Sequence, residues 1–160
     1  MALECFLKLG DIKGESVKDG HKDEIEVLAW SWGMSQSGTT HMGTGGGAGK
    51  VNVQDISFTH YVDKGSPTII QACCKGNHYP EATLTMRKAG GGSPLEYVVI
   101  KLSDVIITSV STGGSGGEDL LTENVTLNFA KFEYSYQPQD NKGAKLGGAV
   151  KVTYDIAQNK

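Results

Sequence analysis

The strongest constraint on the fold is an alternation of apolar and polar residues with a period of two, which recurs along most of the chain. It is cleanest near the end, where Val150, Val152 and Tyr154 alternate with Lys151 and Thr153. Because successive side chains of a β-strand point to opposite faces, this pattern predicts strands. The predicted strands cover residues 2–9, 25–33, 51–62, 79–88, 95–110, 124–136 and 149–156. Short strands separated by turn signals predict a mainly β protein, either a sandwich or a barrel.

Two of the predicted strands, 25–33 and 95–107, are apolar on both faces. In the first, the alternation places Leu28, Trp30 and Trp32 on one face and Ile25, Val27, Ala29 and Ser31 on the other. A barrel that stands alone in water needs only one apolar face on each strand, so a second one predicts contact with a neighbouring subunit. We interpret the tryptophan face as barrel core, which makes Ser31 point outward.

Between the strands, the sequence predicts glycine-rich loops and one short helix. Glycine accounts for 22 of 160 residues, which is about twice its usual share of roughly 7%. The segment 34–50 is the longest stretch without periodicity, and we predict that it forms a long loop that projects from the domain toward a partner. The helix is predicted to follow Ser66 as its cap, with Pro67 at the first helical position, and to end at Gly76.

Composition narrows the functional classes. A net charge of −3 without a basic cluster argues against a nucleic-acid-binding protein. No apolar segment approaches the length of a membrane span. Cys73 and Cys74 are adjacent in the predicted helix and match neither a disulfide framework nor a zinc site, so we expect buried thiols. Residues 1–11 read as a strand rather than a signal peptide, which predicts synthesis in the cytoplasm and, if the protein is exported, a route without a cleaved signal.

No catalytic, cofactor or metal site is predicted from motif spacing. The segment 44–50 is similar to a phosphate-binding loop, but Thr44 and Val51 replace the required glycine and hydroxyl residue, and a strand follows instead of a helix. The histidines are scattered, and we interpret His60, on an apolar strand face, as a structural residue with satisfied hydrogen bonds. A catalytic triad assembled only in space stays open as an alternative, although no nucleophile motif supports it.

Several longer motifs together resemble one protein family. They are VLAWSWGMSQSG (27–38), GGAGKVNVQD (46–55), GNHYP (76–80), RKAGG (87–91), SVSTGGSGGE (109–118) and LTENVTLNFA (121–130). In this order they are similar to the haemolysin-coregulated protein (Hcp) family, the tube proteins of bacterial type VI secretion systems. The resemblance extends over residues 1–156, essentially the whole chain.

The resemblance implies a single domain over residues 1–160, an antiparallel β-barrel with one short α-helix and a long extended loop. It implies that six copies close into a ring and that rings stack into a tube inside a contractile sheath and beneath a spike protein. Small effector proteins travel and are protected in the lumen of such rings. The protein is then cytoplasmic before firing and is expelled without a cleaved signal peptide.

The resemblance also suggests site residues. Ser31 is the candidate for contact with effectors in the lumen. The candidates for contacts between subunits or rings lie in the long loop: Gln36, Ser37, Thr39, His41 and Met42. Two other function classes remain as alternatives, namely a monomeric barrel that holds a small ligand in its mouth and an enzyme. Both permit a monomer, so the mass in solution separates them from a ring.

Overall fold

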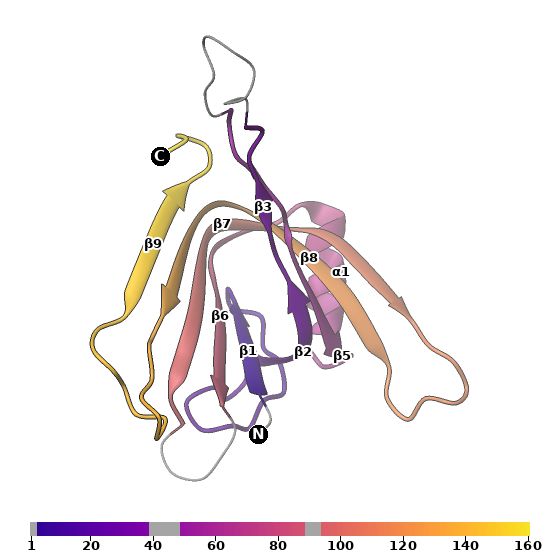
Figure 1. Ribbon diagram of the computed structural model, residues 1–160. Helices are drawn as coiled ribbons and strands as arrows, with labels where there is room; N and C mark the ends of the chain where they lie inside the picture. The colour runs from indigo at the N-terminus through magenta and orange to yellow at the C-terminus, as the bar shows by residue number, and fades with distance from the viewer. Residues whose placement is uncertain (1–2, 39–48, 89–93) are drawn as a thin grey trace.

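The computed structural model describes residues 3–38, 49–88 and 94–160 (Figure 1). The chain is mainly β, with one α-helix in the described residues. The elements in chain order are β1 (Leu3–Leu9), β2 (Ile25–Ser31), β3 (Met34–Ser35), β4 (Asn52–Val53), β5 (Ile56–Tyr61), α1 (Ser66–Lys75), β6 (His78–Lys88), β7 (Glu96–Gly113), β8 (Thr122–Tyr136) and β9 (Val150–Asp155).

Six of the strands form a closed antiparallel barrel. Their order is β5-β2-β1-β6-β7-β8, and β5 also pairs with β8, which closes the sheet on itself. The long strand β8 has two different partners along one edge. Its first half pairs with β5, from Tyr61↔Thr122 to Ile56↔Leu127. Its second half pairs with β9, from Lys131↔Asp155 to Tyr136↔Val150. β9 therefore lies outside the closed barrel as an additional strand. This architecture confirms the predicted β-barrel.

The barrel interior is filled by one apolar cluster, to which every barrel strand and the helix contribute. Leu7, Ile25, Phe58, Leu84, Ile100 and Leu127 are among its fully or almost fully buried members. Burial raises the pKa of the Cys5 thiol in this cluster to about 12, so that the thiol stays protonated at neutral pH. A single contiguous core of this kind holds the barrel together.

The helix α1 packs against β7 and adds Ile69 and Ala72 to the core. Its start differs from the sequence prediction: Gly65 is the cap, Ser66 is already helical, and the Ser66 hydroxyl instead accepts a hydrogen bond from the Asp63 amide. Gly76 ends the helix with a left-handed φ of 65°, as predicted.

The helix cysteines also differ from the prediction that they are buried. Cys73 is only partly buried and Cys74 is exposed. The helix is ten residues long and packs on the barrel along one side, so its outer side, which includes the exposed Ile70, remains in contact with solvent.

A β-bulge in β2 overturns the predicted faces of this strand. Its pairing with β5 shifts between Val27 and Ala29, so that alternation restarts after the bulge. As a result, Ile25 and Val27 belong to the core together with Trp30, whereas Leu28 is exposed and does not share the tryptophan face. The strand therefore has one buried apolar face rather than two.

The strand β7 shows a similar change of side. Val98, Ile100 and Leu102 are buried at even positions, and Val105 and Ile107 at odd positions. Asp104, with a left-handed φ of 54°, lies between the two sets. The apolar residues at even and at odd positions of β7 therefore all belong to the same core. The inference that doubly apolar strands require a neighbouring subunit does not hold for these two segments.

On the outer face of β1, the loop 10–24 covers Phe6, which is 1% exposed although it points away from the barrel interior. The His21 ring stacks on Phe6 with centroids 4.4 Å apart, and the Arg87 guanidinium carbon lies 5.0 Å from the Phe6 centroid. These three side chains form a small second core beneath the loop.

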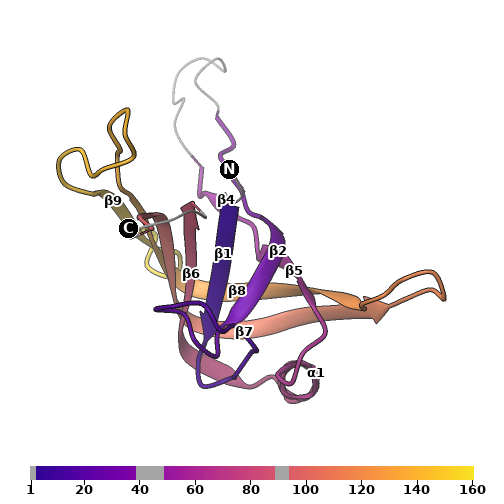
Figure 2. The same cartoon turned by 90° about the horizontal axis from the view of Figure 1, so that it is seen from below.

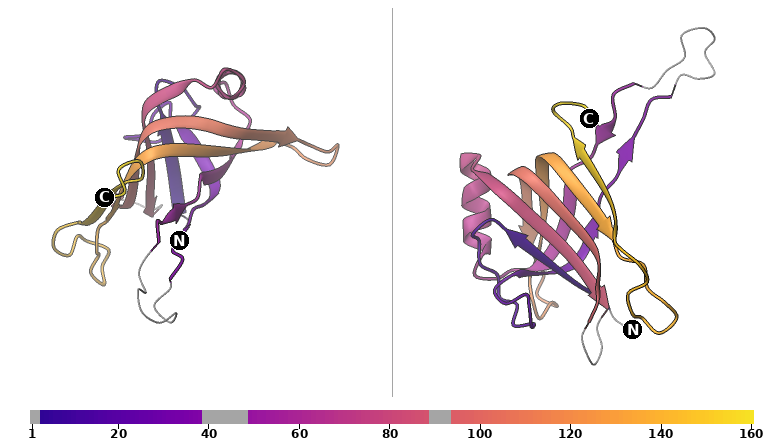
Figure 3. Two further views of the ribbon diagram at one scale, coloured as in Figure 1. Left: turned by 90° about the horizontal axis from the view of Figure 1, so that it is seen from above. Right: turned by 90° about the vertical axis from the view of Figure 1, so that its left-hand side faces the viewer.

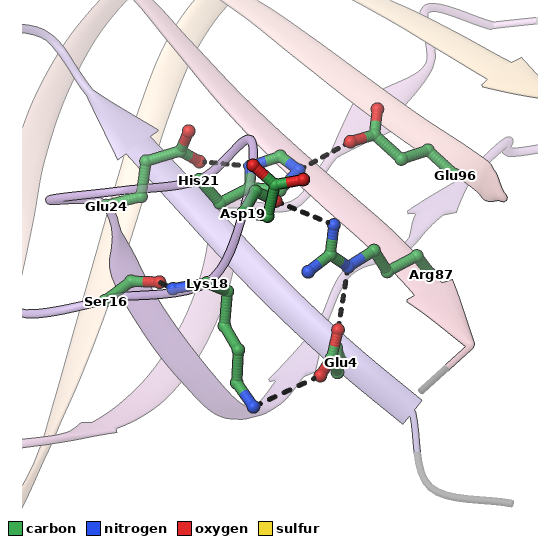
Figure 4. Close-up of polar contacts among 8 residues, drawn as sticks. All are labelled: Glu4, Ser16, Lys18, Asp19, His21, Glu24, Arg87 and Glu96. Atoms are coloured by element: carbon green, nitrogen blue, oxygen red, sulfur yellow. Dashed lines mark hydrogen bonds and ion pairs between the residues drawn. The ribbon is translucent and has the colours of Figure 1, made fainter. Parts of the chain in front are cut away.

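Ion pairs and hydrogen bonds around this second core fix the loop to the barrel (Figure 4). His21 contacts Glu24 at 2.9 Å and Glu96 at 2.5 Å through its two ring nitrogens. Arg87 donates to Glu4 at 2.7 Å and to the Asp19 carbonyl at 3.0 Å. The hydrogen bond from Arg87 holds the pKa of Glu4 below its usual value.

Candidate assembly and cargo-contact surfaces

Ser31 lies at the end of β2, exposed on the outer face of the barrel. Its pairing partner on β5 is Ser57, and the preceding residue, Trp30, pairs with the buried Phe58 and packs against the core. The predicted outward orientation of Ser31 is therefore confirmed. Its role in contacting effectors stays a prediction.

The sheet face around Ser31 carries a network of hydroxyl and amide groups. The Thr126 hydroxyl on β8 lies 2.6 Å from the Ser109 hydroxyl and 2.7 Å from the Thr108 hydroxyl, both on β7. A second bulge, between Ile107 and Ser109, allows both of these residues to reach Thr126. Farther along the same face, the Thr59 hydroxyl of β5 donates to Asn124 of β8.

Asp55 completes this network where the chain enters β5. Its two carboxylate oxygens accept hydrogen bonds from the Thr108 hydroxyl at 2.7 Å and from the Asn128 amide at 2.8 Å. The sequence analysis missed these polar residues. A signal was present, because Asn124, Thr126 and Asn128 alternate with apolar residues in the predicted strand 124–136.

The predicted long loop, 34–50, begins as the first strand of a two-stranded ribbon, since Met34 pairs with Val53 and Ser35 with Asn52. The ribbon leaves the barrel and extends away from it (Figures 1 and 3). Gln36 and Ser37 follow β3 and are exposed, as contacts with another subunit require. The other three candidates, Thr39, His41 and Met42, lie outside the described residues.

An apolar surface is exposed on the wing that β9 forms beside the barrel. The clean alternation of this strand predicts a buried face, but Val150 is 65% and Val152 is 54% exposed. Through pairing, these residues lie on the same side of the sheet as Tyr134 and Tyr136. Leu146, in the preceding loop, is exposed as well. The structure therefore exposes here an apolar face of the kind that strands normally bury.

A second group of exposed apolar residues lies at the opposite side of the molecule. Leu120 and Leu121 are 61% and 49% exposed in the connection between β7 and β8. This long hairpin projects on the side away from β9 in two perpendicular views (Figures 1 and 2). The outer edge of the end of β7 is also unpaired, because its pairing with β6 stops at Ile106, whereas its pairing with β8 continues to Gly113.

A buried ionic cluster joins β5 to β8 at the seam that closes the barrel. His60 and Glu123 are directly paired residues on the two strands, and their side chains are 0% and 1% exposed. His60 Nε2 lies 2.7 Å from Glu123 Oε1, and Nδ1 lies 3.5 Å from Asp63 Oδ2, which is an ion-pair distance rather than a hydrogen bond. His60 is thus a buried histidine on an apolar strand face, as predicted, with a partner that sequence spacing did not reveal. The prediction that its hydrogen bonds are satisfied holds only for Nε2, since Nδ1 has no hydrogen-bond partner among the described residues.

Opposing influences act on the pKa of His60. Burial alone lowers it, but the neighbouring carboxylates of Asp63 and Glu123 outweigh burial, so the pKa of His60 lies above its usual value. The folded protein therefore holds a proton on His60 more tightly than the unfolded chain does. The stability from this proton is fully present below about pH 6.5, the unfolded pKa, and is lost as pH rises through the folded pKa.

We therefore expect His60→Gln to lose most stability relative to the parent protein at about pH 6 and progressively less as the pH rises toward about 9. The measurement is the melting temperature of both proteins across this range, followed by circular dichroism. A difference between the two proteins that stays constant over the range would contradict the role of the His60 proton.

An open groove of about 870 Å³ lies beside β1 and the start of β6. Lys8, Tyr79 and Glu81 are among its lining residues. His78 also lines it and pairs with the exposed Asp104 at 3.0 Å, but no serine or cysteine belongs to the described lining. Within the described ranges, no group of three or more His, Cys, Asp or Glu side chains is arranged so that it could hold a metal ion.

The geometry thus defines a closed, six-stranded β-barrel protein with a polar outer sheet face and two exposed apolar ends. The sequence matches the family model described as "Type VI secretion system effector, Hcp" over residues 6–136. It is 63% identical to Protein hcp1 of Pseudomonas aeruginosa, over 99% of this chain and 98% of that protein.

Solved structures agree with this match. Hcp1 from Salmonella typhimurium is 41% identical and superposes with a TM-score of 0.82, covering 100% of this chain and 99% of the other. A structure described as a type six secretion system protein is 28% identical, with a TM-score of 0.91 and 99% coverage of both chains.

The chain belongs to the Hcp family of type VI secretion proteins. Proteins of this family are secreted structural components of the secretion system. The described helix, α1, is too short to cross a bilayer.

Proposed function

We propose that this chain is the tube subunit of a type VI secretion system, in which six copies close into a ring and rings stack into the expelled inner tube. Contraction of the surrounding sheath drives the tube and its spike outward. Small effector proteins travel in the ring lumen, where contact with Ser31 holds them. Family membership supports the general role, and the surfaces of this chain support the finer assignment.

The observation that carries the proposal is the pair of different apolar surfaces at opposite sides of the subunit. A closed ring needs a head-to-tail contact, in which one patch of a subunit meets a different patch of its neighbour. Val150 and Val152 on the β9 wing provide one such patch, and Leu120 and Leu121 on the β7–β8 hairpin provide the other. Burial of these side chains between subunits gains about 25 cal/mol for each Å² of apolar surface removed from water.

The unpaired strand edges lie next to these patches. Among the described residues, β9 pairs only with β8, so its other edge presents free backbone groups, and so does the end of β7 beyond Ile106. An exposed strand edge is a template for pairing with another chain. Gln36 and Ser37 follow β3 in the projecting ribbon and are exposed, which supports their assignment as contacts with an adjacent subunit or the next ring.

The proposal is tested by the mass in solution, measured by light scattering behind a sizing column. The parent chain of 17.0 kDa is expected to elute at about six times that mass. Val152→Asp is expected to remain folded and to become monomeric, because a carboxylate in the apolar contact would be buried without a partner.

Val17→Asp is the matched control, since Val17 is 86% exposed in the loop 10–24, which is part of neither patch. This variant is expected to keep the ring. A parent protein that stays monomeric at high concentration would contradict the proposal and would favour a barrel that acts alone. A ring that tolerates Val152→Asp would place the subunit contact elsewhere.

A further inference from the structure

Two rows of residues cross the outer face of the barrel without a charged side chain. Strand pairing aligns Ser31, Ser57, Thr126 and Ser109 across β2, β5, β8 and β7. The adjacent row lies two residues away on each strand and contains Ala29, Thr59, Asn124 and Ser111. All eight residues are partly or fully exposed, and we call this surface the neutral band.

The other half of the outer face has the opposite character. Pairing across β1, β6, β7, β8 and β9 aligns Lys8, Thr83, Lys101, Glu133 and Thr153 in one row. The adjacent row across β6 to β9 contains Glu81, Ser103, Lys131 and Asp155. Charged residues thus make up most of the outer positions there and none in the neutral band. General solvent exposure does not explain the difference, since both faces are exposed.

Asp55 lies beside the neutral band, and its charge is internally satisfied. Both carboxylate oxygens accept hydrogen bonds, from Thr108 and from Asn128. A partner pressed against the band therefore meets hydroxyl, amide and methyl groups but no side chain that can neutralise a charge. Each hydroxyl can donate one hydrogen bond and accept others, so the groups bonded to one another still offer lone pairs to a partner.

We propose that the neutral band binds an uncharged, hydrogen-bonding surface of effector proteins and retains them irrespective of their net charge. This rests on the proposed function, in which the face that carries Ser31 lines the lumen. A charged side chain buried against the band loses its hydration without gaining a counter-charge, which is strongly unfavourable. Serine, asparagine, glutamine and backbone amides replace their lost water with hydrogen bonds to the band. Charges elsewhere on the effector stay hydrated and do not affect binding.

The test uses three fluorescent peptides of equal length with assembled rings, read by fluorescence anisotropy. One peptide consists of serine, asparagine and glutamine, and the other two carry glutamate or lysine at regular intervals. The uncharged peptide is expected to bind, with a Kd that changes less than about twofold as salt screens charges more strongly. Both charged peptides are expected to bind at least about tenfold more weakly, which corresponds to about 1.4 kcal/mol.

Variants at Ser109 give the sharper result, because a charged side chain placed in the band supplies the counter-charge that a charged peptide otherwise lacks there. Ser109→Lys is expected to weaken binding of the uncharged peptide and to strengthen that of the glutamate peptide, whereas Ser109→Glu favours the lysine peptide. Ser31→Gln places a bulkier side chain in the same row. It is expected to weaken binding of the uncharged peptide without strengthening binding of either charged peptide. Lys22→Glu, in the exposed loop 10–24, is the control and should alter nothing.

Light scattering on the same samples separates the two proposals. If the parent protein forms no ring, the tube function itself fails. If rings form but bind a charged peptide best, or if the Kd of the uncharged peptide depends strongly on salt concentration, the inference about the neutral band fails while the tube function stands. Loss of the ring in Ser109→Lys would place the band in a contact between subunits and would also overturn the inference.

Discussion

Replacing Glu123 with leucine is expected to lower the free energy of unfolding by about 3–5 kcal/mol, because it leaves the buried His60 without its nearest partner. His60 and Glu123 are almost completely buried, and their side chains cross the seam between β5 and β8 that closes the barrel. Urea denaturation, followed by circular dichroism, measures the change. The exposed ion pair between Lys64 and Asp23 provides the comparison, since Lys64→Ala is expected to cost less than about 1 kcal/mol.

Removing both charges together is expected to restore much of this stability. In the double variant His60→Phe/Glu123→Leu, neither member of this pair carries a charge, and an apolar pair suits the surrounding core. The double variant should therefore be more stable than the sum of the two single changes indicates. Strictly additive losses would contradict a direct interaction between the two side chains and would mean that each contributes only through its own packing.

Phe6→Ala is expected to lower the free energy of unfolding by about 3–5 kcal/mol, the cost typical for a buried phenylalanine. Phe6 carries the second core on the outer face of β1, so the change removes the surface on which His21 and Arg87 pack. The loop 10–24 is then held by its polar contacts alone. Trypsin should cleave the folded variant within this loop, which contains Lys13, Lys18 and Lys22.

Phe6→Leu is the matched control for this change, because it keeps an apolar side chain under the loop. Its expected cost is below that of alanine, about 1.5 kcal/mol or less, and the loop should stay resistant to trypsin. If alanine and leucine caused the same loss, or if the loop remained protected in Phe6→Ala, the polar contacts of Glu24, Glu96 and Glu4 would hold the loop without the second core.

The sequence contains enough information to predict the strands and the barrel but not the points at which a strand changes sides. Alternation in 25–33 predicts one unbroken pattern, whereas the bulge after Val27 moves Ile25 and Val27 to the side of Trp30. Ser31 was placed correctly because it and Trp30 both follow the bulge. A bulge is decided by the fit between two strands, so the residues of one strand carry little trace of it.

Contacts between distant residues were also beyond sequence reasoning. Glu123 is 63 positions from His60, and only the closure of the barrel brings the two together. The alternation of β9 was read correctly as a strand with one apolar face, but periodicity does not tell whether the chain itself covers that face. Resemblance to a family supplied the barrel rather than the sandwich, and the structure confirms that choice.

The division of β8 between two partners has a mechanical consequence. Thr122–Tyr136 runs without interruption from the seam with β5 to the wing formed with β9, so no loop between them can act as a hinge. A neighbour docked on the wing is therefore held at an angle set by the twist and bend of one strand. In a circular assembly, the angle between successive copies fixes how many copies complete the circle. The curvature of β8 would then determine the symmetry of the whole particle, and with it the width of its channel.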